Sequence, residues 1–382
     1  MSWDSVIGEG RAIGILKGVI GSGRVAHAYL ISGPEGSGQD AIAIEFARAL
    51  LCEKGGTAAC EECRSCATSR ALQHPNLKVI MALPVGRNEK YGDPPLARLS
   101  EADLTAVREQ LRLKSDNPYH RIVVPRGNTI KINSIREIRR EASLTGFEEG
   151  RKIFLIFDAE RMSDESSNAL LKTLEEPPGE TTLLLTTDSP DLLLPTIVSR
   201  CQPLRLAPPS VEEIRSALEA RGVGPAEALL AARISAGNYT RALQSVQAGL
   251  GERKREAIDF LRAALLPSRE ETVKSIDAVG QRYQRQEMEE FLSLLREWFR
   301  DAMMLKEGLR TGAQGAAEDG ESLRTFVDRY EAMDLASAEG ALDRAVSLVG
   351  RNVYIPLVLL NLALALRESI VPSEQSYPRT PR

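Results

Sequence analysis

The octapeptide GPEGSGQD, from Gly33 to Asp40, has the frame of a phosphate-binding loop, G-x-x-x-x-G-K-[S/T]. Such a loop joins a buried strand to the N-terminus of a helix, where backbone N–H groups favour phosphate. Gln39 stands where the lysine belongs, and Asp40 stands where the magnesium-binding hydroxyl belongs. The octapeptide therefore either belonged to a nucleotide site that has lost its ligand or was never a phosphate-binding loop.

Short apolar runs and amphipathic helical patterns alternate on both sides of this loop. After it, Ile42, Phe46, Ala49 and Leu50 recur at i, i+4, i+7 and i+8, which is the spacing of one helix face. Strands that alternate with helices in this way predict an α/β fold with a doubly wound parallel sheet. The predicted strands are Ala28–Ser32, Lys78–Leu83, Ile153–Phe157, Thr182–Thr187 and Gln202–Leu206.

Residues 84–126 interrupt this alternation. They carry Gly, Asn and Pro at first, and then a helical pattern from Glu101 to Leu113. We interpret the segment as an insertion at the edge of the sheet.

From Ala207 onward the pattern is almost entirely helical. The sequence Ala207-Pro208-Pro209-Ser210 indicates a linker, in which Ser210 can cap the next helix. Residues 310–322 predict a flexible loop, and the apolar run in residues 352–370 predicts a helix buried on most sides. The predicted domains are residues 1–206, 207–250 and 251–371, followed by a disordered tail, residues 372–382.

The composition limits the classes of function. The chain has 382 residues and 43% hydrophobic residues, enough for two or three packed domains. A net charge of -4 argues against an autonomous, strongly basic nucleic-acid-binding protein, because phosphate neutralisation needs a concentrated Lys/Arg surface. The sequence has neither a long apolar run nor a signal-peptide pattern, so we expect a cytoplasmic protein without a membrane partner.

Four cysteines, Cys52, Cys60, Cys63 and Cys66, fall within fifteen residues in the spacing C-x7-C-x2-C-x2-C. Thiolates this close suit a tetrahedral zinc ion, and four protein ligands leave no open position for water. The pattern predicts a structural zinc site rather than a catalytic one. The alternative is a chance cluster of free thiols.

Several long motifs follow one another through about residue 245. They are HAYLISGPEGSG (27–38), the cysteine cluster, SNALLKTLEEPP (167–178), LLLTTDSPDLLLPTIVSRC (183–201) and GNYTRAL (237–243). In sequence and order they resemble the clamp-loader subunits of bacteria, which are AAA+ proteins of the DNA polymerase III holoenzyme. The resemblance implies an AAA+ module over residues 1–206, a helical lid over 207–250 and a helical collar over 251–371.

The resemblance also implies what has happened to the nucleotide site. In the ATPase members of the family, the Walker B strand ends in Asp-Glu, which serve magnesium and the attacking water. The corresponding positions here are Phe157 and Asp158, and a phenylalanine cannot bind a metal ion. We therefore expect no ATP to be bound by this chain, and a degenerate loop formed by Gly33, Gly36, Gly38, Gln39 and Asp40.

One motif is intact, namely Ser199-Arg200-Cys201. In this family its arginine is an arginine finger that acts in trans, so the resemblance implies that Arg200 reaches toward ATP bound by a neighbouring subunit. A guanidinium carries a permanent charge and five donors, which suit a transferring phosphoryl group. Thr186 and Thr187 fall in the region of the family's sensor 1, a role that we expect to be vestigial.

A lost nucleotide site combined with a preserved finger is similar to the delta-prime subunits. This likeness implies a stator without intrinsic activity, a component of a DNA-directed DNA polymerase holoenzyme that supports loading of the sliding clamp on primed DNA. The implied partners are the gamma/tau ATPase subunits and the delta subunit, with the clamp and primer-template DNA contacted through the complex. Two alternatives stay open: an ATP-hydrolysing subunit of the gamma/tau type, and a zinc-stabilised DNA-binding module.

Overall fold

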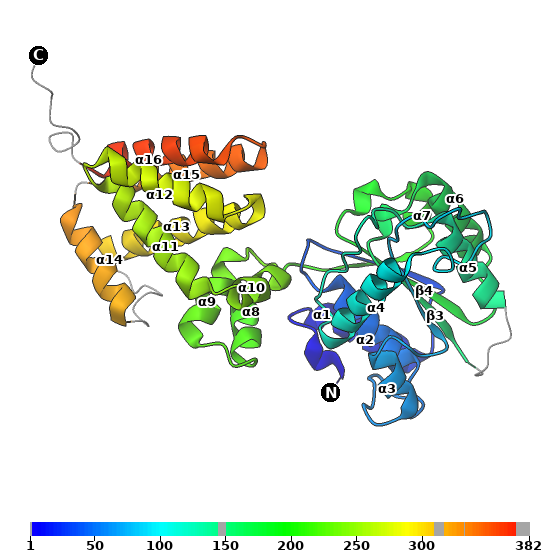
Figure 1. Ribbon diagram of the computed structural model, residues 1–382. Helices are drawn as coiled ribbons and strands as arrows, with labels where there is room; N and C mark the ends of the chain where they lie inside the picture. Colours follow the sequence, from blue (N-terminus) through cyan, green and yellow to red (C-terminus); the bar gives the residue numbers. More distant parts are fainter. Residues whose placement is uncertain (1, 144–149, 309–316, 332, 372–382) are drawn as a thin grey trace, which may run out of the picture. The chain divides into compact units, whose positions relative to one another are not determined.

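The computed structural model describes residues 2–143, 150–308, 317–331 and 333–371. They divide into two compact units (Figure 1). The first unit comprises Met1–Glu213 with Gly237–Arg241, and the second comprises Ile214–Ala236 with Ala242–Arg382. Among the described residues, no helix is both long enough and apolar enough to cross a membrane.

The first unit is built on a five-stranded parallel sheet, which confirms the predicted α/β fold class. The strand order is β2-β3-β4-β1-β5, and strands that follow one another in the sequence are joined by helical crossovers. Strands β1 and β4 are buried along their whole length, as expected for a sheet covered on both faces. The strands are β1 (Ala28–Ser32), β2 (Leu77–Ile80), β3 (Lys152–Ile156), β4 (Thr181–Thr187) and β5 (Gln202–Arg205).

All five predicted strands exist, and β2 differs most from its prediction. It ends at Ile80 rather than Leu83, because Leu83 leaves the sheet and forms an antiparallel bridge with Thr129 instead. In the sheet, Ser32 lies in register with Thr187, and Ile156 lies in register with Leu185. The carboxyl ends of β1, β3 and β4 therefore meet at one edge, where the octapeptide begins.

Helices cover both faces of this sheet (Figure 1). On one face lies α2, which is buried almost throughout and packs Phe46 edge-on against Tyr29 of β1 at 5.2 Å between ring centroids. On the other face, Ile138 and Leu170 pack on Phe154 of β3. The helices of this unit are α1 (Gly10–Ser22), α2 (Gln39–Leu50), α3 (Arg64–Arg70), α4 (Glu101–Asp116), α5 (Ile132–Ser143), α6 (Asp164–Glu175) and α7 (Pro195–Val198), with short 3-10 turns at Ser2–Ser5, Ala159–Arg161 and Pro190–Leu192.

The predicted insertion contains α4, which begins after the capping hydroxyl of Ser100. Val107 and Leu111 of α4 line a cavity with β2 residues, so this helix lies beside the edge strand as predicted. Beyond α4, however, residues 118–121 line a pocket at the start of α2. The sequence pattern did not predict this course of the chain after α4.

The second unit consists of helices in its described residues. Its core includes Phe260 and Phe291, whose rings pack edge-on with their centroids 5.7 Å apart. An ion pair of 3.4 Å between Arg233 Nη1 and Asp301 Oδ1 joins two of its helices. The helices after the sheet are α8 (Val211–Glu219), α9 (Pro225–Ile234), α10 (Tyr239–Gln247), α11 (Leu250–Leu265), α12 (Arg269–Arg282), α13 (Arg285–Lys306), α14 (Ala317–Arg329), α15 (Leu335–Gly350) and α16 (Ile355–Ile370). The three-domain division stays a prediction.

Two predictions in this unit are wrong in part. Residues 317–322 of the expected loop belong to α14, so this helix begins earlier than the sequence pattern indicates. Helix α16 is not buried on most sides: Leu357, Leu360 and Leu364 are 49%, 38% and 49% exposed. These leucines recur on one face of the helix, which the predominance of apolar residues in the run had concealed. Residues 310–316 and the tail 372–382 lie outside the described residues.

Candidate functional site

The glycines of the octapeptide allow protein side chains to approach the loop closely. Gly36 and Gly38 have φ angles of 79° and 91°, in the left-handed region that favours glycine. A Cβ atom on Gly38 would lie 2.9 Å from Tyr119 Oη, and one on Gly36 would collide with the Asn238 side chain. In a working phosphate-binding loop, the phosphate makes this close approach. Here Tyr119 and Asn238 make it.

Gln39 turns its side chain back onto the loop. Its Nε2 donates a hydrogen bond to the Pro34 carbonyl oxygen at 2.9 Å and another to the Gly33 carbonyl oxygen. The side chain is buried at the first position of α2. A neutral amide used in this way closes the loop on itself and brings no positive charge to neutralise a phosphate.

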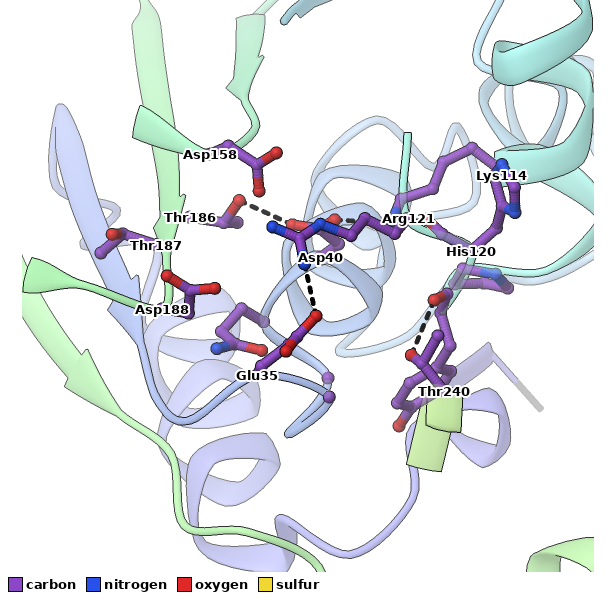
Figure 2. A pocket seen from close by; sticks show the side chains of 15 residues that line it. Glu35, Asp40, Lys114, His120, Arg121, Asp158, Thr186, Thr187, Asp188 and Thr240 are labelled. Atoms are coloured by element: carbon purple, nitrogen blue, oxygen red, sulfur yellow. Dashed lines mark hydrogen bonds and ion pairs between the residues drawn. The ribbon is translucent and has the colours of Figure 1, made fainter. Parts of the chain in front are cut away.

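Asp40 binds two side chains from distant parts of the chain (Figure 2). Its Oδ2 lies 2.5 Å from Lys114 Nζ, and its Oδ1 accepts a hydrogen bond from Thr186 Oγ1 at 2.6 Å. Lys114 is 1% exposed and also donates to the His120 carbonyl oxygen at 2.7 Å. The carboxylate at the start of α2 thus has a buried ammonium group as its counter-ion.

One of the two Walker B positions lies against the same lysine, and the other lines the same pocket. Phe157 follows β3 and is buried, with the centre of its ring 5.2 Å from Lys114 Nζ. Asp158 has a φ of 51° and lines the same pocket. Burial, aided by repulsion from Asp40 and Glu160, raises the pKa of Asp158 to about 6. Nearby Arg161, at 3.7 Å, offsets this only in part.

The space left between these side chains is small. The pocket has a volume of about 70 Å³, whereas sites for drug-sized ligands usually measure about 300–1,000 Å³. Arg121 lies 2.5 Å from Glu35 among the pocket residues, and both side chains are half exposed (Figure 2). Much of the volume that a nucleotide would need is taken by Tyr119, Lys114 and their neighbours.

Arg200 follows α7 in the turn formed by Ser199-Arg200-Cys201. Its Nη2 lies 2.8 Å from Glu175 Oε1 at the end of α6, and its Nη1 donates to the Thr196 carbonyl oxygen at 3.0 Å. The side chain is 36% exposed and is not among the described residues that line the pocket. Cys201 is buried, which raises the pKa of its thiol to about 12.

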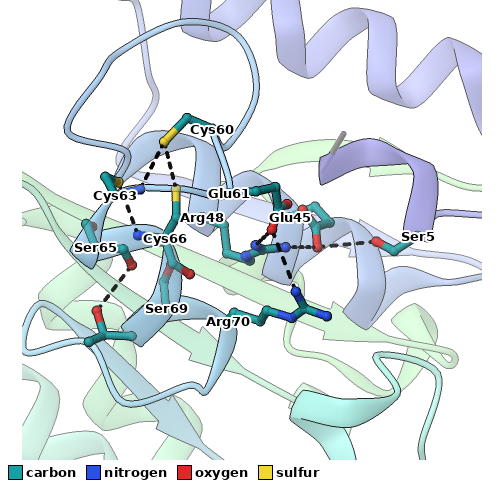
Figure 3. Close-up of polar contacts among 11 residues, drawn as sticks. Ser5, Glu45, Arg48, Cys60, Glu61, Cys63, Ser65, Cys66, Ser69 and Arg70 are labelled. Atoms are coloured by element: carbon teal, nitrogen blue, oxygen red, sulfur yellow. Dashed lines mark hydrogen bonds and ion pairs between the residues drawn. The ribbon is translucent and has the colours of Figure 1, made fainter.

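The four predicted metal ligands come together. The Sγ atoms of Cys52, Cys60, Cys63 and Cys66 all lie within 4.8 Å of one another and can hold a metal ion. Cys66 N donates to Cys63 Sγ at 3.3 Å, and Cys63 N donates to Cys60 Sγ at 3.4 Å (Figure 3). Backbone donors from Glu62 and Cys63 lower the pKa of Cys60 to about 6. The residues present therefore fit a thiolate-bound metal ion.

An ion-pair network ties the cysteine loop to α2 (Figure 3). Arg48, in the last turn of α2, lies 2.6 Å from Glu45 Oε1 and 2.8 Å from Glu61 Oε2, just ahead of Cys63. Ser5 Oγ also donates to Glu45 at 3.2 Å. The side chains of Arg48 and Glu45 are buried, so the cysteine loop is fixed to the same helix that begins with Gln39.

Sequence reasoning missed Lys114, Tyr119 and Asn238 as parts of this site. Lys114 reaches Asp40 across 74 positions of sequence, and no motif links the two residues. The signal in the sequence was Asp40 itself, because a carboxylate that is partly removed from water favours a counter-ion.

The fold and the site define a class: an α/β domain built around a loop of the phosphate-binding type, with a cysteine cluster behind its helix. The sequence profile described as "DNA polymerase III, delta subunit" matches residues 8–210. Because the match covers more than half of the residues of this chain, the chain belongs to this DNA polymerase III subunit family.

Curated relatives agree with this family. DNA polymerase III subunit delta' of Bacillus subtilis is 30% identical over 59% of this chain and 55% of its own length. The subunit delta' of Escherichia coli is 31% identical over 65% of this chain and 62% of its length. Subunit tau of Escherichia coli is 31% identical over 56% of this chain and 27% of its length. The match thus spans 55% and 62% of the length of these two delta' relatives.

The raised pKa of Asp158 predicts a pH-dependent stability. Its folded-state pKa of about 6 exceeds the ordinary 3.8, so the folded state holds the proton more tightly and stability falls as pH rises between these values. We expect Asp158→Asn to raise the free energy of unfolding at pH 7 by about 1–3 kcal/mol. Asparagine also tolerates the left-handed conformation of this position.

Denaturant unfolding across pH 4 to 8 measures this effect, with Asp191→Asn at an exposed turn as the control. The advantage of Asp158→Asn should become small near pH 4, where the folded wild type is almost fully protonated and its unfolded state is about half protonated. A constant difference between Asp158→Asn and the wild type at every pH would contradict this interpretation.

Proposed function

We propose that this chain is a delta-prime-type stator of the DNA polymerase III clamp loader, which supports ATP-dependent loading of the sliding clamp on primed DNA. It binds no ATP and has no turnover of its own. The observation that carries this proposal is the filled loop site, in which Lys114 pairs with Asp40 and lies on Phe157. Its proposed location is the cytoplasm, and its proposed partners are the gamma/tau and delta subunits.

The main alternative is an ATP-hydrolysing subunit of the gamma/tau type. Overall identity does not separate the two, since the delta' and tau relatives are about equally similar where they align. The site separates them: an ATPase needs a lysine and a hydroxyl in the loop and a metal-binding carboxylate after β3. Gln39, Asp40 and Phe157 stand at those three positions.

The second alternative, an autonomous DNA-binding module stabilised by zinc, has less support. A net charge of -4 does not suit a chain that must neutralise many phosphates by itself. Contact with primer-template DNA is therefore proposed only through the assembled complex.

Arg200 is the proposed arginine finger, with Ser199 and Cys201 as its motif neighbours. It lies at the surface, paired with Glu175, and an exposed ion pair of this kind contributes only about 0–1 kcal/mol. A neighbouring subunit's triphosphate, with its higher charge, can therefore compete for the guanidinium. The planar fork of donors would then stabilise charge in the transition state.

The helical second unit is the proposed site of assembly. Leu357, Leu360 and Leu364 of α16 give it an exposed apolar stripe, a feature that suits contact with other helical subunits. Residues 207–250 are proposed as the lid and residues 251–371 as the collar.

Replacing Arg200 with alanine should lower ATP hydrolysis in the reconstituted clamp loader without preventing assembly. At the one site that it serves, an arginine finger contributes about 10³ to 10⁵ in rate. The matched control is Glu175→Ala, which removes the partner of Arg200 but keeps the guanidinium, and which should retain hydrolysis. Steady-state ATPase assays with size-exclusion analysis measure both effects; unchanged hydrolysis in Arg200→Ala would exclude the finger.

The metal proposed for the cysteine cluster is zinc. Four sulfur ligands form a closed tetrahedral set, so the metal would stabilise the loop and would not bind substrate. Without a metal ion, burial raises the pKa of Cys66 to about 12, which favours the protonated thiol. A bound zinc ion would displace this proton and stabilise the thiolate.

Metal analysis tests this assignment. We expect one zinc ion per purified chain, its loss in Cys63→Ser, and a lower unfolding temperature in that variant, since metal binding adds to folding free energy. Cys201→Ala is the control, because Cys201 is buried but lies outside the cluster. A wild-type chain that contains no metal after purification without chelators would refute the zinc site.

A further inference from the structure

The end of the insertion covers the loop. After α4, Tyr119 packs against Gly38, and its Oη accepts a hydrogen bond from Ile7 N at 2.8 Å. Thr240 Oγ1 donates to the Tyr119 carbonyl oxygen at 2.9 Å, and the ring of Tyr239 packs edge-on against that of Tyr119. The insertion thus connects the loop with residues 239–240 inside the first unit.

The charges in the site resemble those of a loaded phosphate-binding loop. Asp40 places a negative charge at the N-terminus of α2, where a phosphate would bind and where the helix dipole favours an anion. Lys114 Nζ places a positive charge beside it, as a magnesium ion would. Thr186 Oγ1 donates to this carboxylate as a hydroxyl would donate to a phosphate oxygen.

We propose that Asp40 and Lys114 are a built-in substitute for ligand, and that the insertion, residues 84–126, serves to deliver the cation. The pair fixes the start of α2, the end of β4 and residues 117–121 in one arrangement, and it excludes anions from the loop. This inference rests on the proposed absence of nucleotide from the site. Lys114 is then a positioning residue, and among the described residues Asp40 is the carboxylate that forms an ion pair with it.

A charge-neutral replacement of Asp40 should uncover that positive charge. In Asp40→Asn, the shape and the contact with Thr186 are kept, while Lys114 loses its counter-ion at a helix N-terminus. The variant should therefore bind inorganic phosphate at least tenfold more tightly than the wild type. The matched control is the double variant Asp40→Asn with Lys114→Met, which should lose this gain.

Calorimetric titration with inorganic phosphate measures these affinities for the full chain. If Asp40→Asn gains no affinity, or if the double variant gains as much, the proposal fails. A purely structural lysine would give no gain in phosphate binding. The outcome is separate from that of the proposed function, which fails if the wild type itself binds ATP.

Unfolding midpoints provide a second test that does not need a soluble Asp40→Asn variant. Lys114→Met alone leaves the Asp40 carboxylate without its counter-ion and should lower the midpoint by several degrees. Adding Asp40→Asn should restore most of the loss, because the two neutral side chains no longer conflict. Equal midpoints for the single Lys114→Met variant and the double variant would show that the two residues are not coupled, and would overturn the proposal.

Discussion

The ion pair between Asp40 and Lys114 is the interaction on which the rest of the first unit depends. It joins the first turn of α2 to the insertion, and through Thr186 it also holds the end of β4. Removing one partner of a buried pair typically costs about 3–5 kcal/mol, because the other charge is left without compensation. The pocket at the start of α2 is thereby occupied in part by groups that belong to the chain.

Helix α2 is held at both ends by ion pairs with other segments of the first unit. Lys114 holds its N-terminus, while Arg48 binds its last turn to the cysteine loop through Glu61. Between these ends, α2 packs on the central strands of the sheet. We propose that a framework fixed by Lys114 and by a metal ion at the cysteine cluster would need no nucleotide to keep its shape. This rigidity suits the proposed stator, whose contribution to catalysis would be to present Arg200 to a neighbouring subunit.

The sequence predicted those features that depend on local patterns. The five strands, the lost lysine and hydroxyl of the loop, and the clustering of the cysteines follow from spacing and residue type, and the structure places them accordingly. The partner of Asp40 could not be predicted, because Lys114 lies in a helix rich in charged residues, whose pattern indicates exposure to solvent. The exposed face of α16 was also missed, since a run made mostly of apolar residues does not indicate which side of the helix is covered.

A crystal structure of the full chain grown with saturating Mg-ATP tests the central claim most directly. The account predicts that Lys114 Nζ will lie within hydrogen-bonding distance of Asp40, with no triphosphate on the loop. A triphosphate bound along residues 33–38, with Lys114 displaced from Asp40, would contradict it.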